Sequence, residues 1–202
     1  MSITFLLTGM LIGFAMAAPL GPLGILCIRK TLTTGHLQGL MIGLGAATVD
    51  MLYSSVAAFG LTAIADGLDS HRILIRLIGG VLLLFIGIRI FRTKPKDPSL
   101  SLTSNGKMKS YIYSLGITLT NPTTIFSFIA VFATFDVAKG ITVYSSAALV
   151  AGIFLGSSLW FLILSSGVAL FRNRLNLKGL SWANRIAGIL IVISGLLAVG
   201  TM

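Results

Sequence analysis

Six stretches of the sequence are each long and apolar enough to cross a lipid bilayer. The hydrocarbon core of a bilayer is about 30 Å thick, and a helix needs about 20 mostly apolar residues to span it. The stretches cover residues 3–28, 37–63, 73–91, 110–134, 141–171 and 181–201. Because lipid offers no hydrogen bonds to an exposed backbone, apolar stretches of this length form transmembrane α-helices. The sequence therefore predicts an all-α integral membrane protein with six transmembrane helices.

The composition agrees with this prediction. Hydrophobic residues make up 55% of the chain and charged residues 10%, whereas soluble domains carry about 25% charged residues. The formal net charge is +10, but membrane proteins gather basic residues in cytoplasmic loops, so we expect no nucleic acid partner. The single cysteine, Cys27, excludes an intrachain disulfide and a two-cysteine redox site. We expect no enzymatic activity and no cofactor.

The distribution of basic residues predicts the orientation of the chain. Of the 15 Lys and Arg residues, 12 lie in or beside the first, third and fifth loops. The positive-inside rule places these loops in the cytoplasm and both termini outside, in a bacterial inner membrane. The polar segment 92–109, rich in Pro, Ser and Lys, is then a cytoplasmic linker. It separates a first three-helix repeat, residues 1–91, from a second, residues 110–202.

Two proline-containing segments interrupt the first and fourth predicted helices at matching places in the two halves. They are Pro19-Leu20-Gly21-Pro22 and Asn121-Pro122. Proline removes a backbone donor and breaks a helix, and lipid tolerates a break only where protein or a watery cavity satisfies the freed groups. Paired breaks in corresponding positions indicate the substrate site of an inverted-repeat transporter. The alternative is a pair of kinks that only shape helix packing.

An internal repeat is also visible in the order of glycine and aromatic residues. Nearly constant offsets of 107, 108 and 100 residues align the halves, and the aligned pairs are Gly45 with Gly152, Tyr53 with Trp160, Gly60 with Gly167, Gly80 with Gly188, Gly87 with Gly195 and Pro22 with Pro122. Three spans per half make the second half enter the membrane from the opposite side. We therefore expect a two-fold axis in the membrane plane, with Pro22 and Pro122 close together near the centre.

Several glycines recur at a spacing that favours close helix packing. The pairs with three intervening residues are Gly9 and Gly13, Gly39 and Gly43, and Gly152 and Gly156. Small residues let helix backbones approach each other in lipid, so packing is the expected role of these glycines.

Asp50 is the strongest functional candidate, because it lies near the middle of the second predicted helix. A charged side chain at this depth costs at least about 2.5 kcal/mol. Three roles remain open: a counter-ion for a substrate ammonium group, a carrier of the coupling proton, and a structural contact between helices. Arg76, about one turn into the third predicted helix, is the candidate partner, unless its side chain extends outward to the interface.

The two breaks suit a zwitterionic substrate. Helices that restart after the prolines would present free N–H groups at Gly24 and at Thr123 and Thr124, where the partial positive charge binds carboxylates. Carbonyl groups freed before the breaks, together with Asn121 and Asp50, would receive the ammonium group. Two aromatic residues, Tyr53 and Trp160, are candidates to line the cavity, with interfacial anchoring or interhelical hydrogen bonding as the alternative.

Taken together, these features resemble the lysine exporter (LysE) family of amino-acid efflux transporters. The matching features are Gly13…Pro19-Leu-Gly21-Pro22, Gly39…Gly43-Leu-Gly45…Asp50, Gly79-Gly80…Gly87, Asn121-Pro122, the region of Trp160 and Gly188…Gly195. The resemblance covers nearly the whole chain and implies efflux of amino acids or close derivatives, driven by protons or membrane potential without ATP. The chain departs from many members in having Val49 before the acid, where glycine is common, and Tyr53, where tryptophan is common.

Two other functions are alternatives to amino-acid efflux. A divalent metal cation exporter of the same superfamily would need several carboxylate or histidine ligands converging in the membrane, and one intramembrane acid argues against it. A purely structural membrane protein would not need a mid-span acid beside two matched breaks. The expected partners are a small-molecule substrate, the lipid bilayer and, as a candidate homodimer, a second copy of the chain.

Overall fold

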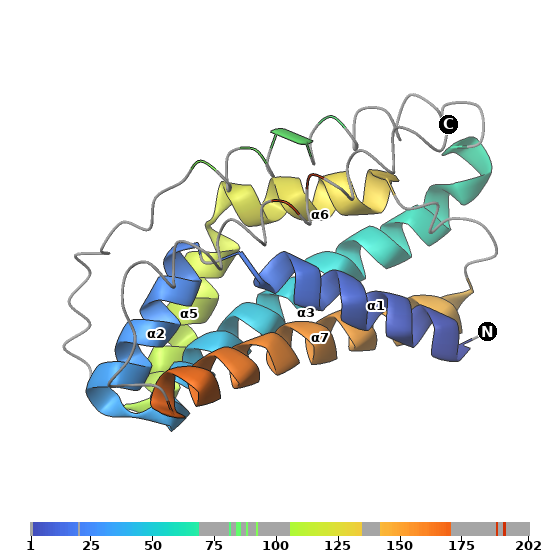
Figure 1. Cartoon of the computed structure of the whole chain (residues 1–202). Helices are drawn as coiled ribbons and strands as arrows, with labels where there is room; N and C mark the ends of the chain where they lie inside the picture. The colour runs from blue at the N-terminus through green and yellow to red at the C-terminus, as the bar shows by residue number, and fades with distance from the viewer. Residues whose placement is uncertain are drawn as a thin grey trace.

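The computed structural model describes residues 2–19, 21–68, 106–134 and 142–170, and the single positions 81, 84, 85, 88, 92, 189 and 192. Every element within the four continuous ranges is an α-helix (Figure 1). The helices are α1 (Ser2–Ala17), α2 (Pro22–Thr34), α3 (His36–Leu68), α5 (Lys107–Leu119), α6 (Pro122–Thr134) and α7 (Val143–Leu170). Apart from the single positions, the predicted third and sixth helices lie outside the described residues, as does Arg76.

Two of the described helices are long and apolar enough to span a membrane. They are α3, over His36–Phe59, and α7, over Val143–Leu170. A third span results if Lys107–Leu119 and Thr124–Phe132 are counted together, and these two segments are bent by 63° relative to each other. The prediction of apolar membrane helices is confirmed for these segments, and the count of six remains a prediction. Helix α5 begins at Lys107, so the last three residues of the segment 92–109, predicted as a linker, are helical.

Both predicted helix breaks are confirmed. Helix α1 ends at Ala17 and α2 begins at Pro22, with Gly21 in an extended conformation as its N-cap. Helix α5 ends at Leu119 and α6 begins at Pro122. Proline fits the first position of each new helix because its missing N–H would have no partner in that turn.

A sharp turn at Gly35 connects α2 to α3. Its φ of 105° lies in a region that side chains disfavour, so glycine suits the position. The Gly35 N–H donates to the carbonyl of Thr31 at 3.1 Å, which closes the end of α2.

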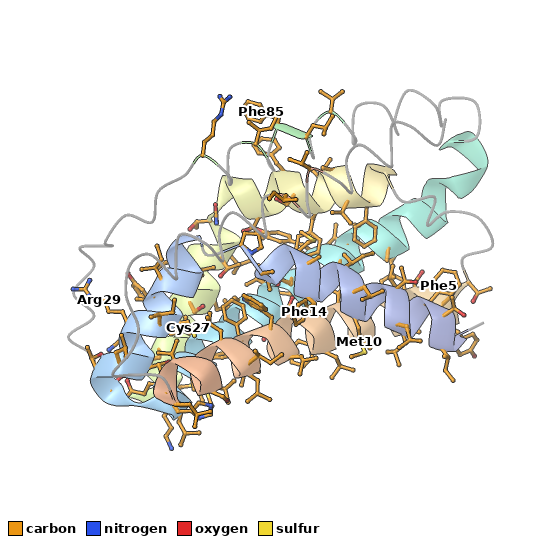
Figure 2. All side chains as sticks on the ribbon, viewed as in Figure 1. Phe5, Met10, Phe14, Cys27, Arg29 and Phe85 are labelled. Atoms are coloured by element: carbon orange, nitrogen blue, oxygen red, sulfur yellow. The ribbon has the colours of Figure 1, made fainter. Side chains whose placement is uncertain are left out.

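Many small and polar residues are buried in the interior of the bundle together with apolar side chains, while other large apolar side chains are exposed on the outer faces of the helices (Figure 2). On α7, Gly152, Gly156, Ser157, Ser165 and several aliphatic residues are buried. Large side chains on the same helix are exposed: Leu155, Leu159, Leu162 and Ile163. This distribution suits lipid as the solvent, because lipid drives no burial of apolar side chains and close packing of small residues stabilises the bundle.

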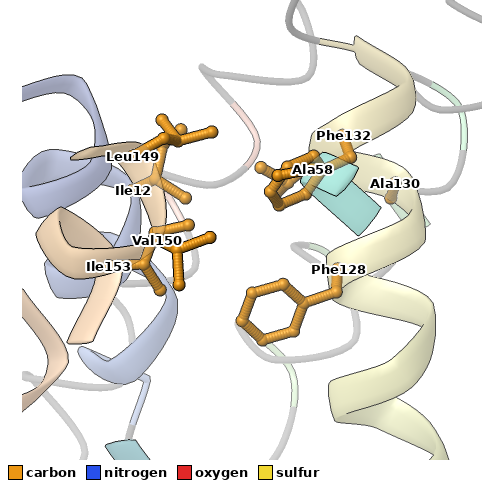
Figure 3. Close-up of a cluster of buried hydrophobic side chains, with 9 residues drawn as sticks. Ile12, Ala58, Phe128, Ala130, Phe132, Leu149, Val150 and Ile153 are labelled. Carbon is orange, nitrogen blue, oxygen red and sulfur yellow. The ribbon is translucent and has the colours of Figure 1, made fainter. Parts of the chain in front are cut away.

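Helices α1 and α7 are in close backbone contact. A Cβ placed on Gly9 would overlap the Leu149 carbonyl oxygen, and one on Gly156 would overlap the Met10 carbonyl oxygen. These glycines therefore let the two backbones touch, as their spacing predicted. Around this contact lies a cluster of buried apolar residues from four helices (Figure 3). Figure 3 shows α1 and α7 contributing Ile12, Leu149, Val150 and Ile153, opposite Ala58, Phe128, Ala130 and Phe132 of α3 and α6.

Helices α3 and α7 pack in opposite directions across the centre of the bundle. His36 contacts Ser166, Gly43 faces Phe161 and Asp50 contacts Ser157. Residue numbers therefore rise along α3 as they fall along α7, so these two helices are antiparallel. This pair carries the buried acid at its centre.

Candidate functional site

Asp50 lies at a junction of three helices. It is the fifteenth residue of α3 and only 7% exposed. The Ser157 hydroxyl of α7 donates to Asp50 Oδ2 at 2.7 Å, and the same hydroxyl oxygen lies 3.1 Å from the carbonyl oxygen of Gly13 on α1. Ser157 is itself fully buried. The acid is thus held by a neutral donor, inside a bundle where an isolated charge is costly.

The pairing of Ser157 with Asp50 was not predicted from the sequence. The predicted partner of Asp50 was Arg76, which lies outside the described residues. Asp50 and Ser157 are 107 positions apart, which is the offset that aligned α3 with α7 in the internal repeat. The signal was therefore present in the alignment of the two halves.

The first break lies at the end of α1. The Gly21 N–H donates to the Pro19 carbonyl at 2.8 Å, which forms a tight turn, and the Ile25 N–H donates to the Gly21 carbonyl at 3.1 Å. Gly24, in the first turn of α2, is buried. The predicted proline and glycine residues thus build a compact turn between α1 and α2.

Trp160 of α7 lies beside the last turn of α1. Its ring packs edge-on against Phe14 with ring centroids 5.2 Å apart. It also packs against the buried cluster of Leu26, Cys27, Ile42, Ala46 and Phe161. Its indole nitrogen is buried and makes no hydrogen bond within the described part of the chain. Trp160 therefore lies near the first break, and its indole N–H is available to donate a hydrogen bond.

The second break is stabilised by a different contact. The Tyr53 hydroxyl of α3 donates to the carbonyl of Leu119, the last residue of α5, at 2.7 Å. The Asn121 carbonyl accepts the N–H of Thr124 at 3.1 Å and so begins α6. The expectation of a free Thr124 N–H is therefore wrong, because this group is already bonded within the chain. The side chain of Thr123 lies outside the described residues.

Polar side chains also join α3 to α5 on the approach to the second break. The Thr48 hydroxyl and the Tyr111 hydroxyl are 2.9 Å apart, and the Ser114 hydroxyl donates to the Ile42 carbonyl. The structure thus brings Tyr53 to the second break, Trp160 to the end of α1 and Asp50 to the junction between α1 and α7. Among the described residues, no group of three or more His, Cys, Asp or Glu could hold a metal ion.

Apolar helices packed through glycines, two proline-broken helices and a buried acid define a membrane transport protein. The family model described as LysE type translocator matches residues 14–200, and the chain belongs to this family. The resemblance noted in the sequence is confirmed.

Individual relatives agree with this assignment. The chain is 27% identical over 194 residues to "Putative amino acid efflux protein YcgF" of Bacillus subtilis (strain 168), covering 94% of this chain and 92% of that one. It is 29% identical over 146 residues to "Uncharacterized membrane protein YahN" of Escherichia coli (strain K12), covering 71% and 65%. It is 24% identical over 183 residues to "Uncharacterized membrane protein slr1627" of Synechocystis sp., covering 88% and 87%. No solved structure matches the chain significantly.

Proposed function

We propose that the chain is a secondary transporter that exports amino acids or close derivatives across the bacterial inner membrane. Export is driven by protons or membrane potential, without ATP. The observation that carries this proposal is the buried Asp50, hydrogen-bonded to Ser157 in the middle of an apolar bundle. An intramembrane acid of this kind marks an ion or substrate pathway. Membership of a translocator family and the name of the Bacillus subtilis relative support the same function.

The proposed architecture is a pair of inverted three-helix repeats, residues 1–91 and 110–202, joined by a cytoplasmic linker. The contact between Asp50 and Ser157 supports it, because equivalent residues of two repeats touch each other only near the axis that relates them. The antiparallel packing of α3 against α7 also fits an axis that lies in the membrane plane.

The packing around two aligned glycines gives independent support. A Cβ on Gly152 would meet three atoms of α1, and a Cβ on Gly45 would meet three atoms of α5. Each atom met at Gly152 has a counterpart met at Gly45, and the pairs are Leu6 O and Tyr111 O, Met10 N and Leu115 N, and Gly9 Cα and Ser114 Cβ. Each pair is 105 positions apart, so α1 crosses α7 as α5 crosses α3. An experimental structure in which the two halves do not superpose by a rotation near 180°, or in which Pro22 and Pro122 lie at opposite membrane faces, would contradict this architecture.

The proposed substrate site lies between the two breaks and Asp50. The positive N-terminal end of α2 at Gly24, after Pro19, Gly21 and Pro22, would attract the substrate carboxylate. The N-terminal end of α6, at Pro122 and Thr123, would add to the same field. Asn121 and Asp50 would receive the ammonium group, while Tyr53, Trp160 and, from outside the described residues, Arg76 would border the cavity.

The decisive experiment is efflux from loaded proteoliposomes that contain the purified chain. Vesicles are loaded with isotopically labelled amino acids, and in a parallel series with divalent cations, and efflux is followed with and without a proton gradient. Amino-acid efflux that responds to the gradient is the expected result. Efflux of a divalent cation, with none of any amino acid, would replace this proposal with metal export.

The role of Asp50 is tested with Asp50→Asn, which keeps size and hydrogen bonding but removes the titratable proton. We expect normal insertion and expression with loss of proton-driven export, because the remaining side chain cannot change its charge. Asp66→Asn is the matched control, since Asp66 lies on the same helix but beyond the apolar span His36–Phe59. If Asp50→Asn transports like the parent with the same pH dependence, the coupling role is wrong. Poor expression with normal transport per folded molecule would instead identify a structural acid.

A further inference from the structure

The Ser157 hydroxyl lies between two acceptors on different helices. Its oxygen is 2.7 Å from Asp50 Oδ2 on α3 and 3.1 Å from the Gly13 carbonyl oxygen on α1. A serine hydroxyl has one hydrogen and can donate to one of these groups at a time, but it can also accept a hydrogen bond. The protonation state of Asp50 therefore decides where the Ser157 hydrogen points.

When Asp50 is a carboxylate, it accepts the Ser157 hydrogen. Hydrogen bonds to a charged acceptor are stronger than those to a neutral carbonyl, so this arrangement is preferred. The Ser157 and Gly13 oxygens then face each other without a hydrogen between them, and the contact between α7 and α1 is weakened.

When Asp50 is protonated, its own O–H can donate to the Ser157 oxygen. The Ser157 hydrogen is then released to the Gly13 carbonyl, and a continuous chain of hydrogen bonds joins α3, α7 and α1. Gly13 is four residues before the end of α1 at Ala17, so the chain ends at the turn of helix that precedes the first break.

The glycines of α1 and α7 make this short path possible. A Cβ on Gly13 would overlap the Ile153 carbonyl oxygen, so only glycine brings the α1 backbone within reach of the Ser157 side chain. The serine hydroxyl is short and bonds directly to the Gly13 carbonyl, so a small shift of α1 would break the contact.

We propose that Ser157 is a positioning residue that links the protonation of Asp50 to the attachment of α1 beside the first break. This inference rests on the proposed function and on one of the roles open to Asp50, that of carrier of the coupling proton. Proton binding holds the end of α1 against α7, and proton release frees it. The attachment of α1 beside the first break then depends on the charge on Asp50, whereas the second break does not depend on it.

Few other titratable groups on the described helices could act in place of Asp50. Helices α1 and α6 contain none. On α2 the other titratable groups are Arg29, Lys30 and Cys27, which is bonded to Gly39. On α3 they are His36 beside Ser166, Tyr53 bonded to Leu119, and Asp66. On α5 and α7 they are the exposed Lys107, Lys109 and Tyr144, Tyr111 bonded to Thr48, and Tyr113. Cys27 and Thr31 of α2 pack at Gly39, eleven residues before Asp50, which is about 16 Å along α3.

The test is the pH profile of proton-driven efflux in Ser157→Ala. Removing the hydroxyl removes the bond to the carboxylate and also both bonds of the protonated state, so the balance between the two states of Asp50 changes. The midpoint of the profile should shift by about one pH unit. Ser165→Ala is the matched control, because Ser165 is equally buried on α7 but its hydroxyl donates to Leu162 of its own helix. Its profile should match that of the parent.

A second measurement follows α1 directly. Amide hydrogen exchange at the end of α1, corrected for the intrinsic effect of pH, should slow in the parent as Asp50 becomes protonated. Ser157→Ala should lose this pH dependence, and Ser157→Thr, which keeps the hydroxyl, should retain it. If Ser157→Ala does not fold, Ser157→Cys, whose thiol is a weak donor, takes its place with the same expected results.

The outcomes separate this inference from the proposed function. Suppose that Ser157→Ala or Ser157→Cys keeps the pH profile and the amide exchange of the parent, while Asp50→Asn loses export. This result would overturn the link through Ser157 and leave proton coupling intact. A parent-like pH dependence in Asp50→Asn would overturn both.

Discussion

Replacing Gly152 with alanine tests the packing on which the bundle depends. A Cβ at this position would overlap the Leu6 carbonyl oxygen and lie 2.9 Å from the Met10 nitrogen, whereas ordinary contact begins at 3.4 Å. All of these atoms belong to the backbone of α1, so no side chain can rotate away. Helices α1 and α7 would have to separate by at least about 0.5 Å.

The expected cost follows from this separation. Forcing an extra carbon into a well-packed interior costs about 1–3 kcal/mol. Alanine also favours a helix over glycine by up to about 1 kcal/mol, which partly hides the loss. Gly167→Ala on the same helix is the matched control, because a Cβ there meets nothing within 4 Å. Both variants gain the same helix propensity, so they should differ in stability by about 1–3 kcal/mol.

The assay is thermal unfolding of the purified chain in detergent, followed by tryptophan fluorescence. For a chain of this length, each kcal/mol moves the apparent Tm by about 2–4 °C. Gly152→Ala should therefore unfold about 2–12 °C below Gly167→Ala, which should equal or exceed the parent. Equal apparent Tm values for the two variants would refute the argument that backbone contact at Gly152 holds α1 against α7.

Two further predictions concern the second break and the topology. Tyr53→Phe removes the donor to the Leu119 carbonyl and should lower the stability by about 1 kcal/mol. Its apparent Tm should therefore be lower than that of Tyr144→Phe, the control, because Tyr144 is 84% exposed. Equal apparent Tm values would mean that this bond does not stabilise the break. With Cys27 replaced by alanine, Asn105→Cys should react with an impermeant thiol reagent only after cells are opened, because the 12 clustered basic residues place the linker in the cytoplasm. Reaction in intact cells would invert the proposed topology.

The class of fold and the places where the helices break follow from the amino-acid sequence alone. Long apolar stretches leave the backbone no alternative to helix in lipid, so α3 and α7 appear where hydropathy predicts them. Proline excludes a continuous helix, so the interruptions before Pro22 and Pro122 follow from local chemistry. The small residues of α1 and α7 likewise indicated a close contact before any partner helix was known.

Which polar groups meet depends on how the helices pack against one another. The depth of Asp50 was readable from its position in α3, but its bond to Ser157 depends on how α3 crosses α7. The bond from Tyr53 to Leu119 likewise depends on how α3 lies beside α5. The hydrogen bond from the Thr124 N–H to the Asn121 carbonyl depends on the geometry of the turn at the second break. Periodicity and composition describe one helix at a time, whereas these contacts arise from the crossing of helices far apart in sequence, where a small rotation replaces one partner by another.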